Sequence, residues 1–175
     1  CPEVPDADKH LIQVGFLPAE PGWWPFLWCY HFGGRLFDGD GKVTAAAPEN
    51  VQALAWVASY SKKLGVAHLQ RFISGFGNFS SPQNPFLSGK VAMEIQGVWM
   101  YNFIDKYAPG LQWGAAPFPY PKSRPDLART TLVDVDMVVI PKGAKHPQEA
   151  FAFMRYLNSQ AAMEMLCLGH RKFSP

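Results

Sequence analysis

Two kinds of side chain in this sequence could act on a small molecule: clustered tryptophans and a few carboxylates. Residues 19–34 read AEPGWWPFLWCYHFGG, with three tryptophans, two phenylalanines and a tyrosine between a Pro-Gly turn and a Gly-Gly pair. Tryptophan presents a flat apolar face for stacking and an N–H group at its edge. The segment is therefore interpreted either as a buried core helix or as a stacking platform, and the residues alone leave both readings open.

The carboxylates do not form a recognisable catalytic motif. Asp134 and Asp136 fall on one face of an expected strand because side chains alternate along it, and Glu20 and Glu94 each lie near aromatic residues. A glycosidase would need two such groups facing each other across a sugar. The sequence contains neither a GxSxG nor an HExxH pattern, so we assign no catalytic residue and do not expect an enzyme.

Two short segments match ligand-binding loops only in part. Residues 35–42, RLFDGDGK, place Lys42 where a calcium loop needs an oxygen ligand, and their Asp-Gly pairs favour a hairpin turn. Residues 88–90, SGK, would need a glycine at Asn84 and a serine or threonine at Val91 to form a phosphate loop. We therefore expect no metal and no cofactor.

Composition and charge exclude several kinds of partner. The 175 residues carry 16 Lys or Arg and 14 Asp or Glu, a formal charge of +2, which predicts no nucleic-acid partner. No apolar run approaches the roughly 20 residues that a membrane-spanning helix needs. The three cysteines, Cys1, Cys29 and Cys167, are spaced too widely for a zinc site. One disulfide among them and a lipid anchor on Cys1 are both left open.

Strand and helix signals alternate along the chain, which predicts an α/β fold. The clearest helix begins at Pro48 and stops at Gly65, and its inner face is expected to consist of Val51, Leu54, Ala55 and Ala58. The clearest buried strand covers residues 132–140, LVDVDMVVI. The other expected elements are strands over 11–17, 91–96 and 112–116, and helices over 25–33, 67–73, 99–107, from 147, and over 160–168.

Four blocks of sequence resemble, in order and spacing, a known family. They are FGGRLFDGDGKVTAAAPENVQAL, NPFLSGKVAMEIQGVW, LQWGAAPFP and VVIPKGAKHPQEAFAFMRYL, and together they lie within residues 11–168. The series is similar to the extracellular solute-binding proteins of bacterial carbohydrate ABC importers, the group that contains maltodextrin-binding protein.

This resemblance implies a periplasmic-binding-protein type II lobe, in which a mixed sheet is flanked by helices. Residues 11–125 would belong mostly to the C-terminal lobe, 126–131 to a crossover or hinge, and 132–168 to a segment that returns to the N-terminal lobe. Members of the family usually carry more residues before position 1 and after position 175. The chain is therefore interpreted as an internal fragment with an incomplete two-lobe fold.

The resemblance also implies particular site residues. Trp99 matches the family's sugar-stacking aromatic, and Trp23 matches a cleft aromatic ahead of the Gly-Gly pair. Trp24 is the alternative if the one-residue gap falls elsewhere. The matches at positions that look structural in the family are Gly33, Gly34, Gly89 and Met93.

Elementary chemistry agrees with a sugar ligand. A pyranose has an apolar C–H face that stacks on an aromatic ring, and a belt of hydroxyls that needs planar polar partners. Such partners here would be Glu20, Gln96 or Asn102. In the aromatic segment we expect Trp23 or Trp24 to face the cleft, whereas the expected packing residues are Phe26, Leu27, Cys29 and Phe32.

The resemblance implies the substrate-binding component of a carbohydrate ABC transporter, which holds an oligosaccharide in an interlobe cleft by aromatic stacking. Its partners would be the sugar and the importer's permease, and its location extracytoplasmic, either periplasmic or lipid-anchored, with the signal outside this chain. The fragment could also self-associate, because pairing would cover the apolar face that a single lobe leaves exposed. The alternatives are a glycosidase-like carbohydrate-active enzyme and a sugar sensor or adhesin module, and the sugar itself is not identified.

Overall fold

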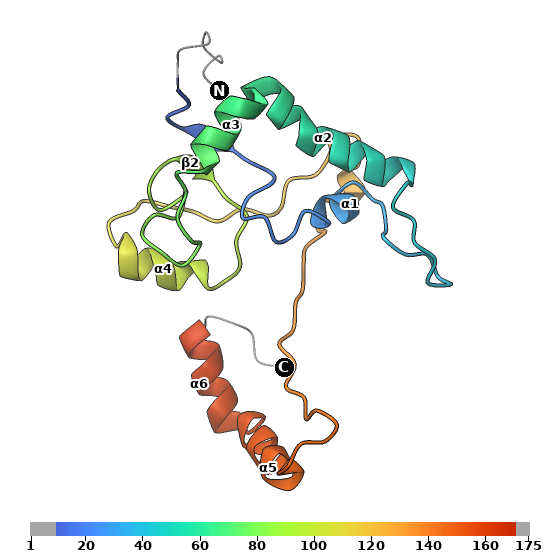
Figure 1. Cartoon of the computed structure of the whole chain (residues 1–175), viewed down its shortest axis with the longest axis vertical. Helices are drawn as coiled ribbons and strands as arrows, with labels where there is room; N and C mark the ends of the chain where they lie inside the picture. The colour runs from blue at the N-terminus through green and yellow to red at the C-terminus, as the bar shows by residue number, and fades with distance from the viewer. Residues whose placement is uncertain (1–9, 171–175) are drawn as a thin grey trace. The chain divides into compact units, whose positions relative to one another are not determined.

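The computed structural model describes residues 10–170 and has the mixed helix and strand composition that the sequence predicts. The described residues divide into two compact units, the first with residues 10–96 and Phe103–Leu132, and the second with Gly97–Asn102 and residues 133–170. The elements, most of which are labelled in Figure 1, are β1 (Val14–Phe16), α1 (Leu27–His31), α2 (Pro48–Leu64), α3 (Val66–Ile73), β2 (Val91–Met93), α4 (Met100–Tyr107), η1 (Pro125–Leu127), α5 (Pro147–Leu157) and α6 (Gln160–His170).

A short parallel strand pair forms part of the first unit's hydrophobic core. β1 and β2 pair with Val14 opposite Val91 and Phe16 opposite Met93. Helix α3 contributes Leu69 and Phe72, which lie three residues apart and therefore share one helix face. Both strands are shorter than the sequence predicts, but they lie within the expected segments.

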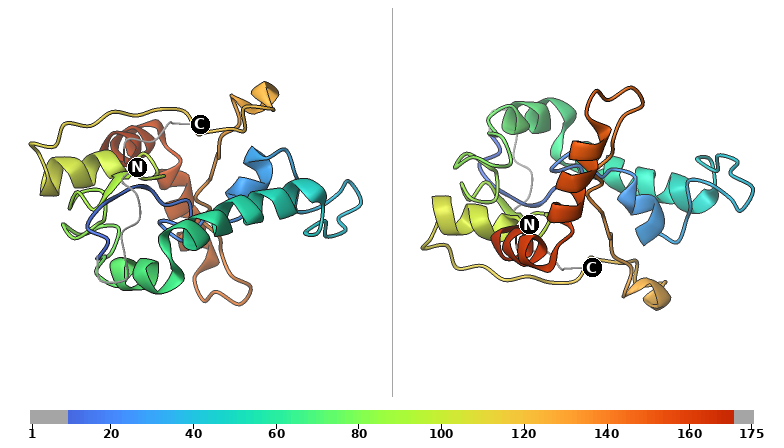
Figure 2. Two further views of the ribbon diagram at one scale, coloured as in Figure 1. Left: turned by 90° about the horizontal axis from the view of Figure 1, so that it is seen from above. Right: turned by 90° about the horizontal axis from the view of Figure 1, so that it is seen from below.

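Helices α1 and α2 lie side by side in every view (Figure 1 and Figure 2) and join through tryptophan rings. Trp28 is only 2% exposed, its Nε1 donates to the Pro18 carbonyl at 2.7 Å, and its ring lies 4.7 Å from that of Trp56. The expected burial of Leu27 and Cys29 is confirmed. The expected burial of Phe26 is wrong, because this residue stands at the N-cap position before the helical turn and is 39% exposed.

The Gly-Gly pair ends α1, as the sequence predicts. Gly33 adopts a φ of 86°, which a residue with a side chain rarely tolerates, and its N–H donates to the Tyr30 carbonyl at 2.9 Å. The N–H of Gly34 reaches back to the Cys29 carbonyl at 2.8 Å. Together these two bonds form a Schellman motif, which satisfies carbonyl groups that the end of the helix leaves open.

Helix α2 has the predicted boundaries but a different inner face. Val51 and Leu54 are 54% and 51% exposed, whereas Asn50 and Ala53 are fully buried. The Asn50 amide donates to the carbonyls of Arg35 at 2.7 Å and Thr44 at 2.8 Å. These bonds fix the rotation of the helix about its axis, so a polar residue takes the place that hydrophobic periodicity assigned to the apolar ones.

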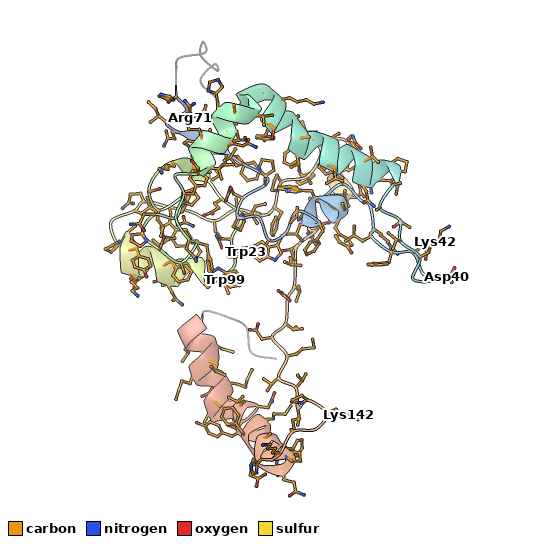
Figure 3. All side chains as sticks on the ribbon, viewed as in Figure 1. Trp23, Asp40, Lys42, Arg71, Trp99 and Lys142 are labelled. Carbon is orange, nitrogen blue, oxygen red and sulfur yellow. The ribbon has the colours of Figure 1, made fainter. Side chains whose placement is uncertain are left out.

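The expected hairpin between α1 and α2 is confirmed. Phe37 and Val43 form an antiparallel bridge, and the Asp38 carboxylate accepts the backbone N–H groups of Asp40 at 3.0 Å and Lys42 at 2.8 Å. Asp40 and Lys42 lie at the tip of this loop (Figure 3). The first aspartate of the motif therefore acts as a turn former.

The second unit contains the helical hairpin of α5 and α6, and α5 begins at Pro147 as predicted. The strand expected over 132–140 is not formed, and residues 133–139 are exposed, including Val133 at 81% and Met137 at 81%. The strand expected over 112–116 is also absent from the first unit. A strand needs a neighbour for its backbone hydrogen bonds, and none of the residues 10–170 pairs with either segment.

The structure also tests the expectations about the cysteines and about membrane-spanning helices. Cys29 is buried, Cys167 is half-buried, and both are free thiols, so no disulfide joins them. Cys1 and its lipid anchor lie outside the described residues. Across residues 10–170, no helix has both the length and the apolar character needed to cross a membrane.

His31 is a buried histidine whose ring nitrogens have no hydrogen-bond partner among the described residues. Its ring stacks on Phe118 at 4.7 Å, and burial lowers its pKa from the ordinary value. We expect the free energy of unfolding to fall as the pH drops below neutral. The unfolded histidine takes up a proton near pH 6.5, so stability that is complete above this pH is lost as the pH falls toward the folded pKa.

Urea unfolding as a function of pH measures this effect. The loss of stability below about pH 6.5 should be smaller in His31→Phe, which keeps an aromatic ring against Phe118. It should persist in the control His146→Gln, whose histidine is exposed. An unchanged pH dependence in His31→Phe would show that another group is responsible.

Candidate functional site

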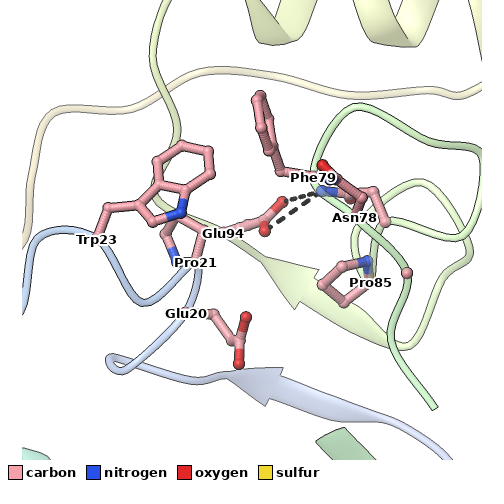
Figure 4. Close-up of a pocket in the computed structure, with 9 residues that line it drawn as sticks. Glu20, Pro21, Trp23, Asn78, Phe79, Pro85 and Glu94 are labelled. Carbon is pink, nitrogen blue, oxygen red and sulfur yellow. Dashed lines mark hydrogen bonds between the residues drawn. The ribbon is translucent and has the colours of Figure 1, made fainter. Parts of the chain in front are cut away.

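A cavity of about 320 Å³ lies in the first unit, between the segment that follows β1 and the loop that precedes β2 (Figure 4). Its wall combines aromatic rings, amides and two carboxylates. The lining residues are Glu20, Pro21, Trp23, Gly77, Asn78, Phe79, Asn84, Pro85 and Glu94.

Trp23 supplies the largest flat surface of the cavity. Its ring meets Phe79 edge-on at 4.4 Å and Trp24 edge-on at 5.5 Å, and 41% of the residue is exposed. Trp24 instead lines a separate space of about 10 Å³ with Glu20 and Trp28, too small for a sugar ring. Between the two alternatives that the sequence left open, the geometry therefore favours Trp23 as the cavity aromatic.

The loop over residues 77–85 forms the opposite wall and is closed by its own backbone. The N–H of Gly77 donates to the Gln83 carbonyl at 2.9 Å, and a Cβ on Gly77 would run into the side chain of Gln83. Asn78 accepts the N–H of Ser80 at 3.1 Å. Phe79 packs on Phe103 of α4 at 5.7 Å. The ring of Phe79 is thus supported from behind where it faces Trp23.

Glu94 follows β2 and is held by an amide at the cavity wall. The Nδ2 atom of Asn84 lies 3.2 Å and 3.4 Å from the two carboxylate oxygens of Glu94, as the dashed lines in Figure 4 mark. Asn84 itself is fully buried. The carboxylate therefore has a fixed partner inside the protein and still borders the cavity.

Both cavity carboxyls are displaced toward the neutral form. Burial raises the pKa of Glu20. Burial also raises the pKa of Glu94, hydrogen bonds from Asn84 and Gln96 lower it, and the negative charge of Glu20 raises it again. The result is a pair of partly dehydrated carboxyls that lack a basic partner in this cavity, a chemistry suited to hydrogen bonds with ligand hydroxyls. Within residues 10–170, no group of His, Cys, Asp or Glu assembles that could hold a metal ion.

The structure brings Glu20 and Trp23 together, and it adds Glu94 to them. Trp99 belongs to the second unit, where it is half-buried and its ring covers Gly97 so closely that a Cβ there would collide with it. Asn102, also in the second unit, donates to the Gly169 carbonyl at 2.8 Å, so its amide is engaged within that unit. The roles of Glu20, Trp23, Trp24 and Trp99 as ligand contacts stay predictions.

Sequence reasoning missed Asn84, Gly77 and Phe79 as parts of the site. Asn84 attracted notice only as a residue that disqualifies a phosphate loop. The available signal was the composition of residues 74–90, SGFGNFSSPQNPFLSGK, which is rich in glycine, serine, asparagine and proline. Such a segment indicates an irregular, self-bonded loop, and loops of this kind often carry binding residues.

The family model for the bacterial extracellular solute-binding proteins matches residues 2–164. The chain belongs to this family. Binding proteins of Brucella abortus and Brucella suis are each 27% identical to it over 131 residues, which is 75% of this chain and 30% of theirs. The family and these relatives are binding proteins, and the family is extracellular, in line with the expected extracytoplasmic location.

Two solved structures of a sugar-binding protein are similar to this chain. CpMnBP1 with mannobiose bound has a TM-score of 0.80 and 29% identity over 98% of this chain and 43% of that one. CpMnBP1 with mannotriose bound has a TM-score of 0.70 and 31% identity over 86% of this chain and 39% of that one. The solute-binding fold class predicted from the sequence is confirmed, and the chain spans less than half the length of these relatives. The lobe boundaries at residues 125 and 132 stay predictions.

Proposed function

We propose that this chain forms part of the sugar site of a solute-binding protein that serves a carbohydrate ABC importer. The single observation that carries the proposal is the cavity that places the exposed ring of Trp23 beside the carboxyls of Glu20 and Glu94. The ligand class is a short oligosaccharide, with mannobiose and mannotriose as the first candidates because CpMnBP1 holds them.

The proposed binding mode follows from the two kinds of surface in the cavity. The apolar C–H face of one sugar ring stacks on Trp23, and its hydroxyls donate to the carboxylates of Glu20 and Glu94. The volume of about 320 Å³ is near the lower end of the range for ligand pockets. The stacking role of Trp99, which the family resemblance implies, is a separate proposal, because Trp99 does not line this cavity.

The wider role is that of a carrier, and the two carboxyls take no part in bond cleavage. The protein would work outside the cytoplasm, in the periplasm or on a lipid anchor, and deliver sugar to a membrane permease. Ligand contacts made only in a closed conformation would shift the population toward that conformation. Family membership and the sugar-bound relatives support this role.

The test is calorimetric titration of the complete gene product with mannobiose, mannotriose and maltose, combined with the variant Glu94→Gln. A charged acceptor forms a hydrogen bond about twice as strong as a neutral one, so the variant should bind mannobiose about tenfold more weakly. The matched control is Glu149→Gln, which neutralises an exposed carboxylate at the start of α5 and should leave the Kd unchanged.

Two results would overturn the proposal. One is the absence of saturable binding to any of the three sugars. The other is the release of mannose from mannobiose during incubation with the protein, as detected by chromatography. Sugar release that is lost in Glu20→Gln or Glu94→Gln would favour the glycosidase-like alternative.

A further inference from the structure

Asn84 has a buried side chain, and both its amide oxygen and its amide nitrogen form hydrogen bonds. Its Oδ1 atom accepts the backbone N–H groups of Phe86 at 2.8 Å and Leu87 at 3.0 Å. Its Nδ2 atom approaches both carboxylate oxygens of Glu94. The residue has no exposed surface, so water is not an alternative partner.

The orientation of this amide follows from its neighbours. A flipped amide would set its NH₂ group against two backbone N–H donors and its oxygen against a carboxylate, and both contacts would repel. In the observed orientation, Oδ1 accepts from the two N–H groups of the turn, and Nδ2 therefore points at the Glu94 carboxylate. The turn therefore determines where the amide points, and the amide determines where Glu94 sits.

The turn is itself tied to β2. The Asn84 carbonyl accepts the N–H of Ser88 at 2.9 Å and the hydroxyl of Ser88 at 2.9 Å. The Pro85 carbonyl accepts the N–H groups of Lys90 at 2.8 Å and Val91 at 3.0 Å, where β2 begins. Glu94 directly follows that strand. Asn84 thus links the loop wall of the cavity to the carboxylate beyond the strand.

We propose that Asn84 is the positioning residue of the sugar site, which orients the Glu94 carboxylate so that it accepts hydrogen bonds from the ligand's hydroxyls. This inference rests on the proposed function. The amide group straddles both carboxylate oxygens, which holds the plane of the carboxylate without occupying all of its acceptor sites. Asn84 acts on the ligand through Glu94, because its own side chain is fully buried.

The groups around Glu94 set its pKa, so the proposed role of Asn84 should make sugar affinity depend on pH. The titratable group that acts on it is Glu20, whose negative charge raises the pKa of Glu94, as burial does even more strongly. Hydrogen bonds from Asn84 and Gln96 lower this pKa. Asn84 therefore extends the pH range in which Glu94 is an ionised acceptor. Sugar affinity should decline as the pH falls through the Glu94 titration, because protonation replaces a charged acceptor by a neutral carboxyl that accepts more weakly.

The deciding variant is Asn84→Asp, made in the complete gene product. Aspartate retains an oxygen that accepts the N–H groups of Phe86 and Leu87, but it replaces the amide donor by a second carboxylate next to Glu94. The Glu94 titration, followed by NMR of ¹³C-labelled glutamate side chains without ligand, should move to higher pH. The acid limb of mannobiose affinity should move with it, and affinity at pH 7 should fall about tenfold.

Two further measurements separate positioning from a general structural effect. Ser88→Ala removes a hydroxyl bond from the same turn and should leave the Glu94 titration in place. In the unmodified protein, the Asn84 side-chain NH₂ resonances should titrate with the Glu94 midpoint, which tests the contact even if Asn84→Asp does not fold.

The inference is overturned if the Asn84 resonances do not follow Glu94, or if Glu94 titrates alike in the Asn84→Asp variant and the unmodified protein. A different outcome concerns the proposed function. If the Glu94 titration moves in Asn84→Asp as expected but neither mannobiose nor mannotriose binds at any pH, the proposed sugar ligand is wrong. The conclusion that Asn84 positions the Glu94 carboxylate is then unaffected.

Discussion

Trp23→Ala should weaken mannobiose binding about thirtyfold or more. Truncating a large aromatic side chain that forms the centre of a binding surface typically costs about 2 kcal/mol or more, which corresponds to that change in Kd. Trp23 fits this description because it provides the exposed ring of the cavity and is braced edge-on by Phe79. Calorimetric titration of the complete gene product measures the Kd directly.

Two matched variants make this prediction specific. Trp113→Ala removes a ring of similar exposure, 44% against 41% for Trp23, from a position outside the cavity, and should leave the Kd within twofold. Trp24→Ala should have a smaller effect than Trp23→Ala, because Trp24 lines only the space of about 10 Å³. If Trp24→Ala were the more damaging change, the stacking ring would be Trp24.

The helices were the most predictable part of the fold because their signals are local. Pro48 at the start, lysines in the last turn and Gly65 as the stop define α2 without reference to any other segment. The same holds for α5, which begins at Pro147. The Gly-Gly pair likewise predicts the end of α1, since a residue with positive φ is a local requirement.

The strands and helix faces were less predictable because they depend on distant partners. Residues 132–140 have an apolar strand pattern, yet none of the residues 10–170 pairs with them, and residues 133–139 are exposed. The inner face of α2 depends on Asn50 meeting the carbonyls of Arg35 and Thr44. Hydrophobic periodicity carries no information about such a polar anchor.

The site was predictable only as far as residue type suggests a role. Trp23 was selected because it matches a cleft aromatic of the family that the sequence resembles and because an aromatic ring suits a sugar. Glu20 was selected because a carboxyl suits sugar hydroxyls, and the structure places both at one cavity. Asn84 was not selected, because its importance arises from contacts with Phe86, Leu87 and Glu94 that no spacing rule describes. Residues that position others are generally visible only once the contacts are known.

Gly34→Ala should lower the free energy of unfolding by about 3 kcal/mol. A Cβ at this position would press directly on Asn50 Oδ1 and lie 3.1 Å from the Cys29 carbonyl oxygen. Overpacking of a buried site costs about 1–3 kcal/mol. Asn50 has no room to retreat, because it is fully buried and moving it breaks its bonds to Arg35 and Thr44, worth about 1 kcal/mol each.

Urea unfolding followed by tryptophan fluorescence measures the loss, and Gly39→Ala is the matched control. Gly39 lies in the adjacent hairpin, and a Cβ there meets nothing within 4 Å, so its midpoint should change little. Adding Asn50→Ala should cost less in the Gly34→Ala background than alone, because the first substitution has already displaced the amide. Additive effects, or equal midpoints for the two glycine variants, would mean that the junction of α1 and α2 does not depend on the close approach of Gly34 to Asn50.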